Sequence, residues 1–536
     1  MSDFNAVPDY IIVGAGSSGC VLAAELTSDP KRTVLLIEGG GSDRSFLVDM
    51  PRGLAKLLEP GSRYVRDYDV RRGGNRGTER WMKGRVIGGS SSINGMIYAR
   101  GFPADYDRWA ALGCPGWGWS DMVRHFKAIE DHDLGETDER GAGGPLRVSG
   151  HPTDAAGGAL CEAVIKAAAQ AGTPRVDDTN AAPEGGIAYQ ARTIWRGKRQ
   201  SAAKAFLRPA MKRPNLTVAS DTEVLRIVFD GRTAVGVEVR DKHGVRVNRA
   251  RREVILCAGA LESPKLLQLS GIGPGKRLRD LGIDVMHDQP QVGQNLREHL
   301  YLQTKFRVND GGLNREFVGL RLLRNVLRYL FTGAGPMSHA AQELVGYIRS
   351  RDGLPRPDCQ IGVGLYSLAE GPKGLALEAE PGFTIGGYFM HPRSRGEIVI
   401  SSPDPAAPPY IDANYLAEEE DRTASVGMVR AIRHIVAQPA LAGIVRTELA
   451  PGPAVQSDDD ILDDLYARGG TAFHVSGTCR MGSDDAAVTD PAGRVRGVEG
   501  LRVVDTSLFP DLPSGNTNAP AMAAGRNVAR RMLAER

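Results

Sequence analysis

Residues 10–19 read YIIVGAGSSG, in which four apolar residues run directly into a Gly-rich turn. The apolar run predicts a buried strand over 10–13, and the turn leads into a helix predicted over 21–27. The apolar residues at 33–37 predict a second strand. The segment therefore predicts a strand–helix–strand unit, the usual start of a Rossmann-like parallel sheet and hence of an α/β fold.

The turn carries the pattern Gly-x-Gly-x-x-Gly, and an acidic residue closes the second strand. Such glycines allow a tight turn and bring the backbone close to a pyrophosphate, which then lies at the positive end of the helix. Glu38 stands 24 residues after Gly14 and can accept hydrogen bonds from ribose hydroxyls. The pattern predicts dinucleotide binding, against the alternative of a Gly-rich turn without a ligand. The carboxylate of Glu38 disfavours the 2′-phosphate of NADP, and the choice between FAD and NAD stays open. The predicted contacts are Gly14, Gly16, Ser17, Ser18, Gly19 and Glu38.

Bulk composition limits the function only broadly. A length of 536 residues predicts two to four structural units. Lys and Arg number 67 against 64 Asp and Glu, so the charge favours no nucleic-acid partner. The 6 cysteines are scattered without metal-ligand spacing, so we expect free thiols and no metal site. The N-terminus lacks the features of a signal peptide, and no apolar run approaches the ~20 residues that cross a bilayer, which together favour a cytoplasmic protein.

Further along the chain the patterns change. Residues 73–101 are dense in Gly, Ser and Arg, which predicts loops around a ligand rather than regular elements. Residues 216–258 alternate apolar and polar positions, which predicts an antiparallel meander. The segment 301–465 mixes helical stretches with strand-like pieces, and we expect a second domain there.

Three tracts resemble the signatures of the glucose-methanol-choline oxidoreductases, in that family's order. They are KGRVIGGSSSINGMIYARGFPADYDRWAALGCPGW from residue 83, GALESPKLLQLSGIG from residue 259, and HVSGTCRMG with LRVVDTSLFPDLPSGNTNAPAMAAG from residues 474 and 501. Further family-like text, VGQNLREHL among it, extends the similarity over nearly the whole chain, with the weakest part between about residues 305 and 380. The resemblance implies FAD-dependent oxidation of a primary alcohol to the aldehyde, with O2 or a quinone-type acceptor reoxidising the flavin. Aryl or furan-type alcohols are the favoured substrates.

The resemblance also implies how the chain is divided. A Rossmann-like FAD-binding domain would comprise residues 1–158, 215–300 and 466–536. A substrate-binding domain, built on an antiparallel sheet with helices, would comprise residues 159–214 and 301–465. The sequence gives no indication of the oligomeric state.

Carried over position by position, the family pattern implies further contacts with FAD. Gly88, Gly89 and Ser90 would line the pyrophosphate, Asn94 and Gly95 the isoalloxazine ring, Val224 the adenine, Asp505 the ribityl-phosphate stretch, and Asn518 and Ala519 the far edge of the ring. Some members attach FAD through a histidine just before that Asn, but here the residue is Ile93, which has no nucleophilic atom. We therefore expect non-covalent FAD.

Alcohol oxidation needs a base for the hydroxyl proton, and a neutral imidazole suits that task. Of the 10 histidines, His474 lies where the family carries its catalytic base, and the other nine, including His299 and His151, show no comparable setting. The partner position in the family is occupied here by Asn516, whose amide would stabilise the developing alkoxide. Helix capping is the alternative role for Asn516.

Several alternatives remain open. Glu343 has the spacing of the acid that choline-oxidising members use for the trimethylammonium group, yet the aromatic residues of a cation cage are missing. Some proteins of this fold cleave cyanohydrins without redox chemistry, and others could bind flavin without catalysis. Arg321, Arg324 and Arg328 fall on one face of a predicted helix with leucines opposite. That pattern is typical either of a peripheral membrane contact or of an ordinary solvated helix.

Overall fold

The computed structural model describes residues 7–150, 157–371 and 374–535. His151 and part of the N-terminal stretch discussed above lie outside the described residues. Within the described residues, no helix combines the length and the apolar character needed to span a bilayer. The domain boundaries inferred from the resemblance stay a prediction.

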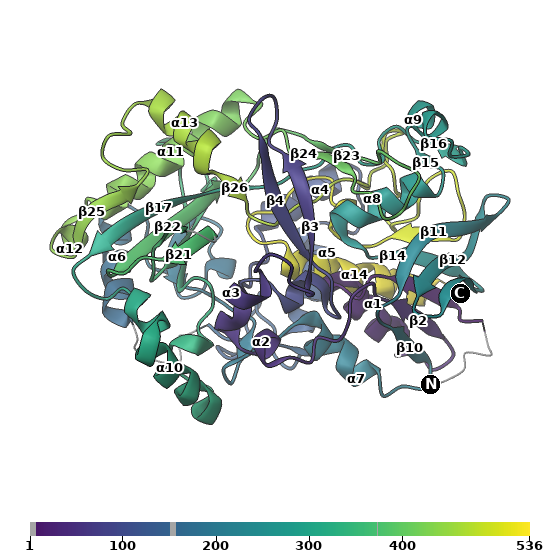
Figure 1. Ribbon diagram of the computed structural model, residues 1–536, viewed down its shortest axis with the longest axis horizontal. Helices are drawn as coiled ribbons and strands as arrows, with labels where there is room; N and C mark the ends of the chain where they lie inside the picture. Colours follow the sequence, from purple (N-terminus) through teal and green to yellow (C-terminus); the bar gives the residue numbers. More distant parts are fainter. Residues whose placement is uncertain (1–6, 151–156, 372–373, 536) are drawn as a thin grey trace.

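A five-stranded parallel sheet forms one part of the molecule, in the order β10-β2-β1-β14-β27 (Figure 1). The strands β2, β1, β14 and β27 are almost entirely buried, as expected for a parallel sheet covered on both faces, and the edge strand β10 is half-buried. Helix α1 packs against α14, which returns from the end of the chain. The predicted strand–helix–strand unit is confirmed, although the helix begins four residues earlier than expected. The bounds are β1 (Tyr10–Val13), α1 (Ser17–Leu26), β2 (Val34–Ile37), β10 (Leu216–Ala219), β14 (Glu253–Leu256), β27 (Leu501–Val503) and α14 (Asn518–Ala534).

The meander predicted over 216–258 is wrong at both ends. Only β11 (Glu223–Asp230), β12 (Thr233–Asp241) and β13 (Gly244–Arg249) form an antiparallel sheet. The flanking β10 and β14 pair in parallel with β2 and β1 instead. Alternation of apolar and polar residues reports which face a side chain points to, and it does not report which strand lies alongside.

A seven-stranded antiparallel sheet forms the other part, in the order β25-β17-β22-β19-β18-β7, with β26 beside β17. Helices α6 and α11 cover one of its faces. The two parts together confirm the predicted α/β class, with a Rossmann-like sheet and an antiparallel sheet with helices. The bounds are α6 (Gly158–Gln170), β7 (Gly186–Tyr189), β17 (Leu300–Val308), β18 (Leu344–Ile348), β19 (Cys359–Gly364), β22 (Gly382–Phe389), α11 (Glu419–Val436), β25 (Val445–Ala450), α13 (Asp458–Arg468) and β26 (Gly470–Thr471).

The hairpin β3 (Val65–Arg71) and β4 (Thr78–Gly84) stands between the two large sheets in Figure 1. It belongs to a four-stranded sheet with β23 (Glu397–Val399) and β24 (Tyr410–Asp412). The expectation of irregular structure throughout 73–101 is therefore wrong for β4. The glycines before it form the hairpin turn, and the pairing with β3 then imposes a regular strand.

Further helices and strands connect these sheets. They are α2 (Phe46–Asp49), α3 (Leu54–Leu57), α4 (Pro103–Ala111), α5 (Trp119–Ile129), β5 (Glu130–His132), β6 (Leu146–Val148), β8 (Ile194–Trp195), β9 (Lys198–Arg199), α7 (Arg208–Ala210), α8 (Gly259–Leu269), β15 (Ile272–Gly273), α9 (Gly275–Asp280), β16 (His287–Asp288), α10 (Gly319–Thr332), β20 (Leu368–Gly371), β21 (Gly374–Leu377) and α12 (Pro439–Ala442).

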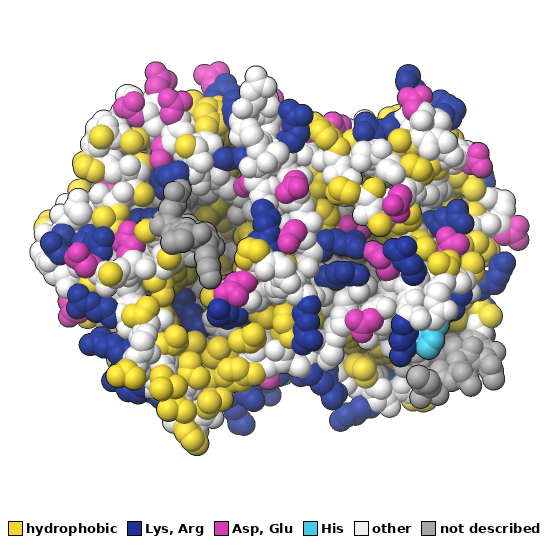
Figure 2. Space-filling model, viewed as in Figure 1, with side chains coloured by type: hydrophobic (Ala, Val, Ile, Leu, Met, Phe, Trp, Pro, Cys, Tyr) yellow, Lys and Arg dark blue, Asp and Glu magenta, His cyan; other side chains and the backbone are white. Residues whose placement is uncertain are grey.

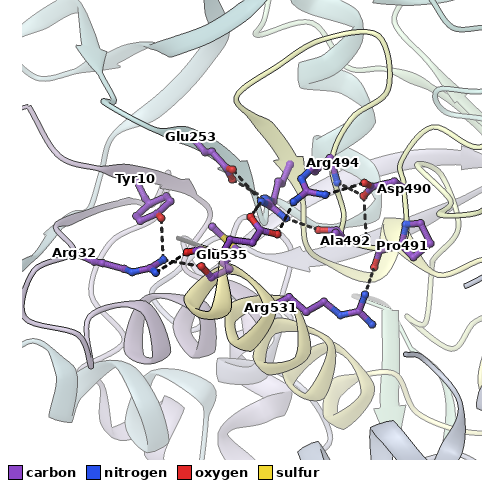
Figure 3. Close-up of polar contacts among 11 residues, drawn as sticks. Tyr10, Arg32, Glu253, Asp490, Pro491, Ala492, Arg494, Arg531 and Glu535 are labelled. Atoms are coloured by element: carbon purple, nitrogen blue, oxygen red, sulfur yellow. Dashed lines mark hydrogen bonds and ion pairs between the residues drawn. The ribbon is translucent and has the colours of Figure 1, made fainter. Parts of the chain in front are cut away.

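Polar contacts hold the C-terminal end of α14 against the parallel sheet (Figure 3). Arg32 donates to the carbonyls of Met532 and Glu535, so a cation satisfies the free carbonyls at the negative end of the helix. The buried Arg502 of β27 bridges Glu253 and Glu535. Because its far end is fixed in this way, α14 presents its first turn in a defined position.

Candidate active site

A cavity of about 510 Å³ lies between the two large sheets. Val13 and Ile37 border it from the carboxyl ends of β1 and β2, and Tyr301 and Gln360 border it from β17 and β19. Its size is typical of cavities that enclose a small molecule or part of a cofactor. In open parallel sheets this edge is the usual place for a ligand.

Most of the residues selected from the sequence border this cavity. They are Gly14, Gly16, Ser17, Ser18, Glu38, Gly89, Ser90, Asn94, Gly95, Val224, His474, Asp505, Asn516 and Asn518. Gly19, Gly88 and Ala519 do not border it. A Cβ on Gly19 would meet the carbonyl oxygen of Gly14 at 2.0 Å, so Gly19 serves the packing of α1 against the turn.

The Gly-rich turn is built for close approach of backbone. Gly14 has φ +103°, and a Cβ there would lie 2.5 Å from the carbonyl oxygen of Cys257. Gly89 has φ +52°, and its Cβ would lie 2.7 Å from the Cα of Gly16. A side chain at Gly14 would clash with the backbone just after β14, and one at Gly89 would clash with Gly16 in the turn itself. Gly14, Gly16 and Gly89 all border the cavity, so this region offers backbone without side chains to an extended dinucleotide.

Glu38 fixes the same turn. Its carboxylate accepts hydrogen bonds from the backbone N–H groups of Ala15 and Gly40, at 2.9 and 2.8 Å. Burial raises the pKa of Glu38 to about 7. The carboxylate borders the cavity with further acceptor capacity, which suits the ribose hydroxyls predicted from the sequence.

Two helix N-termini converge on the cavity. Ser17 begins α1 and Asn518 begins α14, and the Ser17 hydroxyl donates to the Asn518 side-chain oxygen at 2.7 Å. Both residues border the cavity. Because the positive ends of two helices meet there, this end of the cavity suits an anionic group such as the diphosphate of FAD.

At the other end of the cavity, His474 forms the centre of a chain of hydrogen bonds. The Nε2 atom of His474 lies 2.8 Å from the side-chain nitrogen of Asn516. Its Nδ1 atom lies 2.9 Å from Nδ1 of His299, and Nε2 of His299 lies 2.8 Å from the carbonyl oxygen of Met390. The side-chain oxygen of Asn516 accepts from Gln360 at 3.1 Å. The structure thus brings together the two predicted residues and adds a second histidine.

These hydrogen bonds determine the tautomers of the His299 and His474 imidazole rings. A carbonyl only accepts, so His299 must donate to Met390 from Nε2, and a neutral ring then keeps a lone pair on Nδ1. His474 therefore donates from Nδ1, which leaves the lone pair of its Nε2 facing Asn516. Burial lowers the pKa of His299 to about 3. Burial, then His299 and the Lys83 ammonium, hold the pKa of His474 well below its usual 6.5.

The backbone around His474 is held by a buried acid. Glu298 accepts from the N–H groups of His474 and His299, at 2.8 Å each. Burial raises the pKa of Glu298 and lowers the pKa of the nearby Lys83. Phe473 adopts φ +65°, an uncommon conformation for a residue with a side chain. Such a conformation persists only where the surroundings impose it, so the position of His474 is well determined.

The wall opposite the nucleotide turn is polar but uncharged. It is formed by one face of β17, β19 and β22 together with the residues just before β18. Its side chains include Tyr301, Gln303, Gln342, Gln360, Tyr366, Thr384 and Tyr388. Gly386 gives room to this wall, since a Cβ there would lie 1.9 Å from the hydroxyl oxygen of Tyr301. The Gln360 Oε1 and Tyr388 hydroxyl atoms are buried without a hydrogen-bond partner, so they can serve a bound molecule.

Glu343 does not border the cavity. Its carboxylate lies 2.8 Å from His339, 3.5 Å from Arg52 and 3.9 Å from Arg192. Although burial raises the pKa of Glu343, the hydrogen bond and charge of His339 and the charges of the two arginines lower it on balance. Glu343, the possible choline-binding acid, is therefore part of a buried ion-pair cluster.

The sequence did not reveal several residues of this site. His299 has no distinctive local setting, and its place in the family-like stretch VGQNLREHL is the one signal that points to it. Glu298 lies in the same family-like stretch and Lys83 opens the tract KGRVIGG, but their roles depend on contacts with a segment about 170 residues or more away in sequence. Gln342 and Gln360 lie in the stretch where the resemblance is weakest.

Comparison with known proteins identifies the family of this chain. Models of the family described as GMC oxidoreductase match residues 8–301 and 392–525. The oxygen-dependent choline dehydrogenase of Chromohalobacter salexigens is 39% identical over 98% of this chain and 94% of its own length. The mitochondrial choline dehydrogenase of Homo sapiens is 40% identical over 97% of this chain and 89% of its own. Pyridoxine 4-oxidase from Mesorbium loti superposes with a TM-score of 0.89 at 32% identity, covering 99% of this chain and 100% of that one. The chain therefore belongs to the GMC oxidoreductase family and is an FAD-dependent oxidoreductase that acts on the CH–OH group of alcohols.

Proposed function

We propose that the protein oxidises an uncharged primary alcohol to the aldehyde, with His474 as the general base. The observation that carries this proposal is the lone pair of His474 Nε2, which faces Asn516 at the cavity wall. A base of low pKa is unprotonated at neutral pH and can accept the hydroxyl proton directly.

Asn516 complements this base. An alcohol oxygen inserted between the two side chains would donate its proton to His474 Nε2 and accept a hydrogen bond from the Asn516 amide. That amide is oriented by the Gln360 donor on its oxygen. It would stabilise the negative charge that develops on the alcohol oxygen. When bound, FAD supplies the hydride acceptor for the alcohol carbon, and O2 or a quinone-type acceptor takes the electrons onward.

The uncharged polar wall supports a neutral substrate. None of the side chains that border the cavity from β17, β19 or β22 carries a charge. The acids that do border it are Glu38, Glu223, Glu262 and Asp505. Glu223 and Glu262 pair with Arg66, and the other two belong to the cofactor end. Unpaired amide and phenol groups favour a substrate with hydrogen-bonding groups of its own, such as a substituted aryl or heteroaryl alcohol.

Choline is the second candidate, and the names of the relatives at 39% and 40% identity favour it. Against it stands the ion-pair cluster around Glu343, which leaves a trimethylammonium group without a carboxylate at the cavity wall. The discriminating pair is choline and its neutral isostere, in which a tert-butyl group replaces trimethylammonium. We expect the isostere and aryl alcohols to have the higher kcat/KM. A clear preference for choline would contradict the neutral-substrate proposal.

Anaerobic mixing with these alcohols also separates oxidation from the other classes. Loss of the flavin absorbance band indicates hydride transfer, and an unchanged band favours a lyase or a binding protein without catalysis.

The His474→Ala variant should keep its FAD and lose turnover by on the order of 10²–10⁴. Its control is His243→Ala, a change on an exposed turn, which should leave the rate unchanged. A full rate in His474→Ala would refute the assigned base.

A further inference from the structure

Helix α10 turns an apolar stripe toward solvent. Six of the thirteen exposed large hydrophobic residues of the described chain fall within 318–331. They are Val318, Leu320, Leu323, Leu327, Leu330 and Phe331, of which Leu320 and Phe331 are each 85% exposed. Figure 2 shows hydrophobic side chains gathered at the lower edge of the molecule, where Figure 1 places α10. We call these six residues the α10 stripe.

The inner face of α10 includes the polar residues that attach it to the protein. Asn325 is buried and donates to the carbonyl oxygen of Glu316 at 2.9 Å. Tyr329 is buried and donates to the carbonyl oxygen of Gly197 at 3.1 Å. A surface helix usually does the reverse and buries its apolar stripe. The orientation of α10 is therefore fixed by specific hydrogen bonds, and the protein core does not account for the stripe.

Positive charge lies beside the stripe. Arg321, Arg324 and Arg328 are on the helix, which contains no acidic residue. Arg321 and Arg324 share a single carboxylate, that of Glu316, at 3.0 and 3.2 Å. Two guanidinium groups against one carboxylate leave a net positive charge at the edge of the stripe. Exposed leucines and phenylalanine flanked by arginines are typical of helices that lie in the plane of a membrane surface.

The residues beneath α10 are close along the chain to two residues that border the cavity. Tyr329 packs against Met50 and Met337 beneath the helix. The chain after Met50 continues into α3, and Leu54 and Leu58 at the two ends of this turn border the cavity. A surface that receives α10 would thus lie close to the part of the cavity that Leu54 and Leu58 border.

We propose that the α10 stripe docks the protein onto a bilayer containing anionic lipid, with the leucines and Phe331 entering the acyl boundary and the arginines meeting the headgroups. Charge favours this occupant over a second copy of the chain. A two-fold contact pairs the stripe with itself and so brings two positively charged surfaces together. Anionic headgroups instead complement the arginine row.

The test is sedimentation of the FAD-loaded protein with vesicles of phosphatidylcholine alone or mixed with phosphatidylglycerol. We expect binding to the mixed vesicles that weakens as salt is added. Leu320→Glu with Phe331→Glu should weaken it at least about tenfold, because two apolar side chains lose their burial. Arg321→Gln with Arg324→Gln should weaken it on the mixed vesicles only, by about fivefold or more.

The matched control is Val245→Glu with Val247→Glu, an exposed apolar pair on β13. This pair should bind vesicles like the unchanged protein. All variants should keep the flavin spectrum and the alcohol oxidation rate with a water-soluble acceptor, which shows that they fold. Absence of binding to the mixed vesicles would overturn the proposal. A dimer in light scattering that dissociates in the Leu320→Glu, Phe331→Glu variant, without vesicle binding, would overturn it in favour of self-association.

Discussion

The Nδ1 atoms of His299 and His474 lie 2.9 Å apart, although the two residues are 175 positions apart in sequence. Because His299 donates to the Met390 carbonyl, it can only accept from His474. His299 thereby selects the tautomer in which the lone pair of His474 Nε2, the proposed base, faces Asn516. His299 does not itself border the cavity, and we therefore propose it as a positioning residue.

Replacement of His299 should test this assignment. His299→Leu removes the acceptor, and we expect a loss of about 10- to 100-fold in activity, the scale found for partners that fix the tautomer of metal-bound histidines. His299→Gln offers an oxygen acceptor and should recover part of the rate. Steady-state kcat and its pH profile are the measurements. Equal losses in both variants would show that His299 acts only through packing.

In a plot of kcat/KM against pH, the loss of activity toward acid should have its midpoint below pH 6.5. A general base works when unprotonated, so a pKa held below 6.5 by burial, His299 and Lys83 extends the active range toward acid. Lys83→Met removes a positive charge near His474, which should raise the pKa of His474 and move this midpoint to higher pH. The measurement is kcat/KM against pH in both proteins. A midpoint at or above pH 6.5 in the unchanged protein would count against the assignment.

FAD should dissociate from the denatured protein. Ile93 borders the cavity at the position where some family members attach the flavin, and its side chain offers no nucleophile. Acid precipitation should leave a yellow supernatant and a colourless pellet. The absorbance of each fraction is the measurement, and a yellow pellet after washing would indicate a covalent bond elsewhere.

Glu343→Gln should affect stability more than catalysis. The change withdraws the carboxylate from Arg52 and Arg192, and breaking a buried ion pair costs about 3 kcal/mol or more in the free energy of unfolding. The folded-state pKa of Glu343 is lowered, so its stabilisation is present above its unfolded value of 4.5 and is lost as the pH falls through the lowered pKa. Chemical denaturation at neutral and acid pH should therefore show a difference that narrows in acid.

The matched control for this prediction is Glu59→Gln, which breaks an exposed pair with Lys56. Exposed pairs contribute about 0–1 kcal/mol, so little change is expected. The KM for neutral alcohols should stay unchanged in both variants. A large rise of KM for choline alone in Glu343→Gln would restore the cation-binding role that the ion-pair cluster argues against.

Local patterns predicted much of the fold. The strand at 10–13, the Gly-rich turn and the second strand each depend on neighbouring residues, so their sequence carries the information. The same patterns were wrong where partners decide the structure. β4 is regular because it pairs with β3, and β10 joins the parallel sheet because β2 lies beside it. The alternation of apolar and polar residues along one strand does not indicate which strand pairs with it.

The sequence by itself determined the Gly-rich turn and the family, and it singled out His474 and Asn516, since these follow from residue types in contiguous stretches. Only the tertiary structure decided which side chains meet. In the folded protein, His299 contacts His474, and Glu343 forms an ion pair with Arg52. Asn518 lies within 2.7 Å of Ser17, although the two residues are 501 positions apart in sequence. The tertiary structure also turned the α10 stripe outward, where a local pattern would bury it. Such contacts depend on how the whole chain packs, and no short stretch of sequence encodes them.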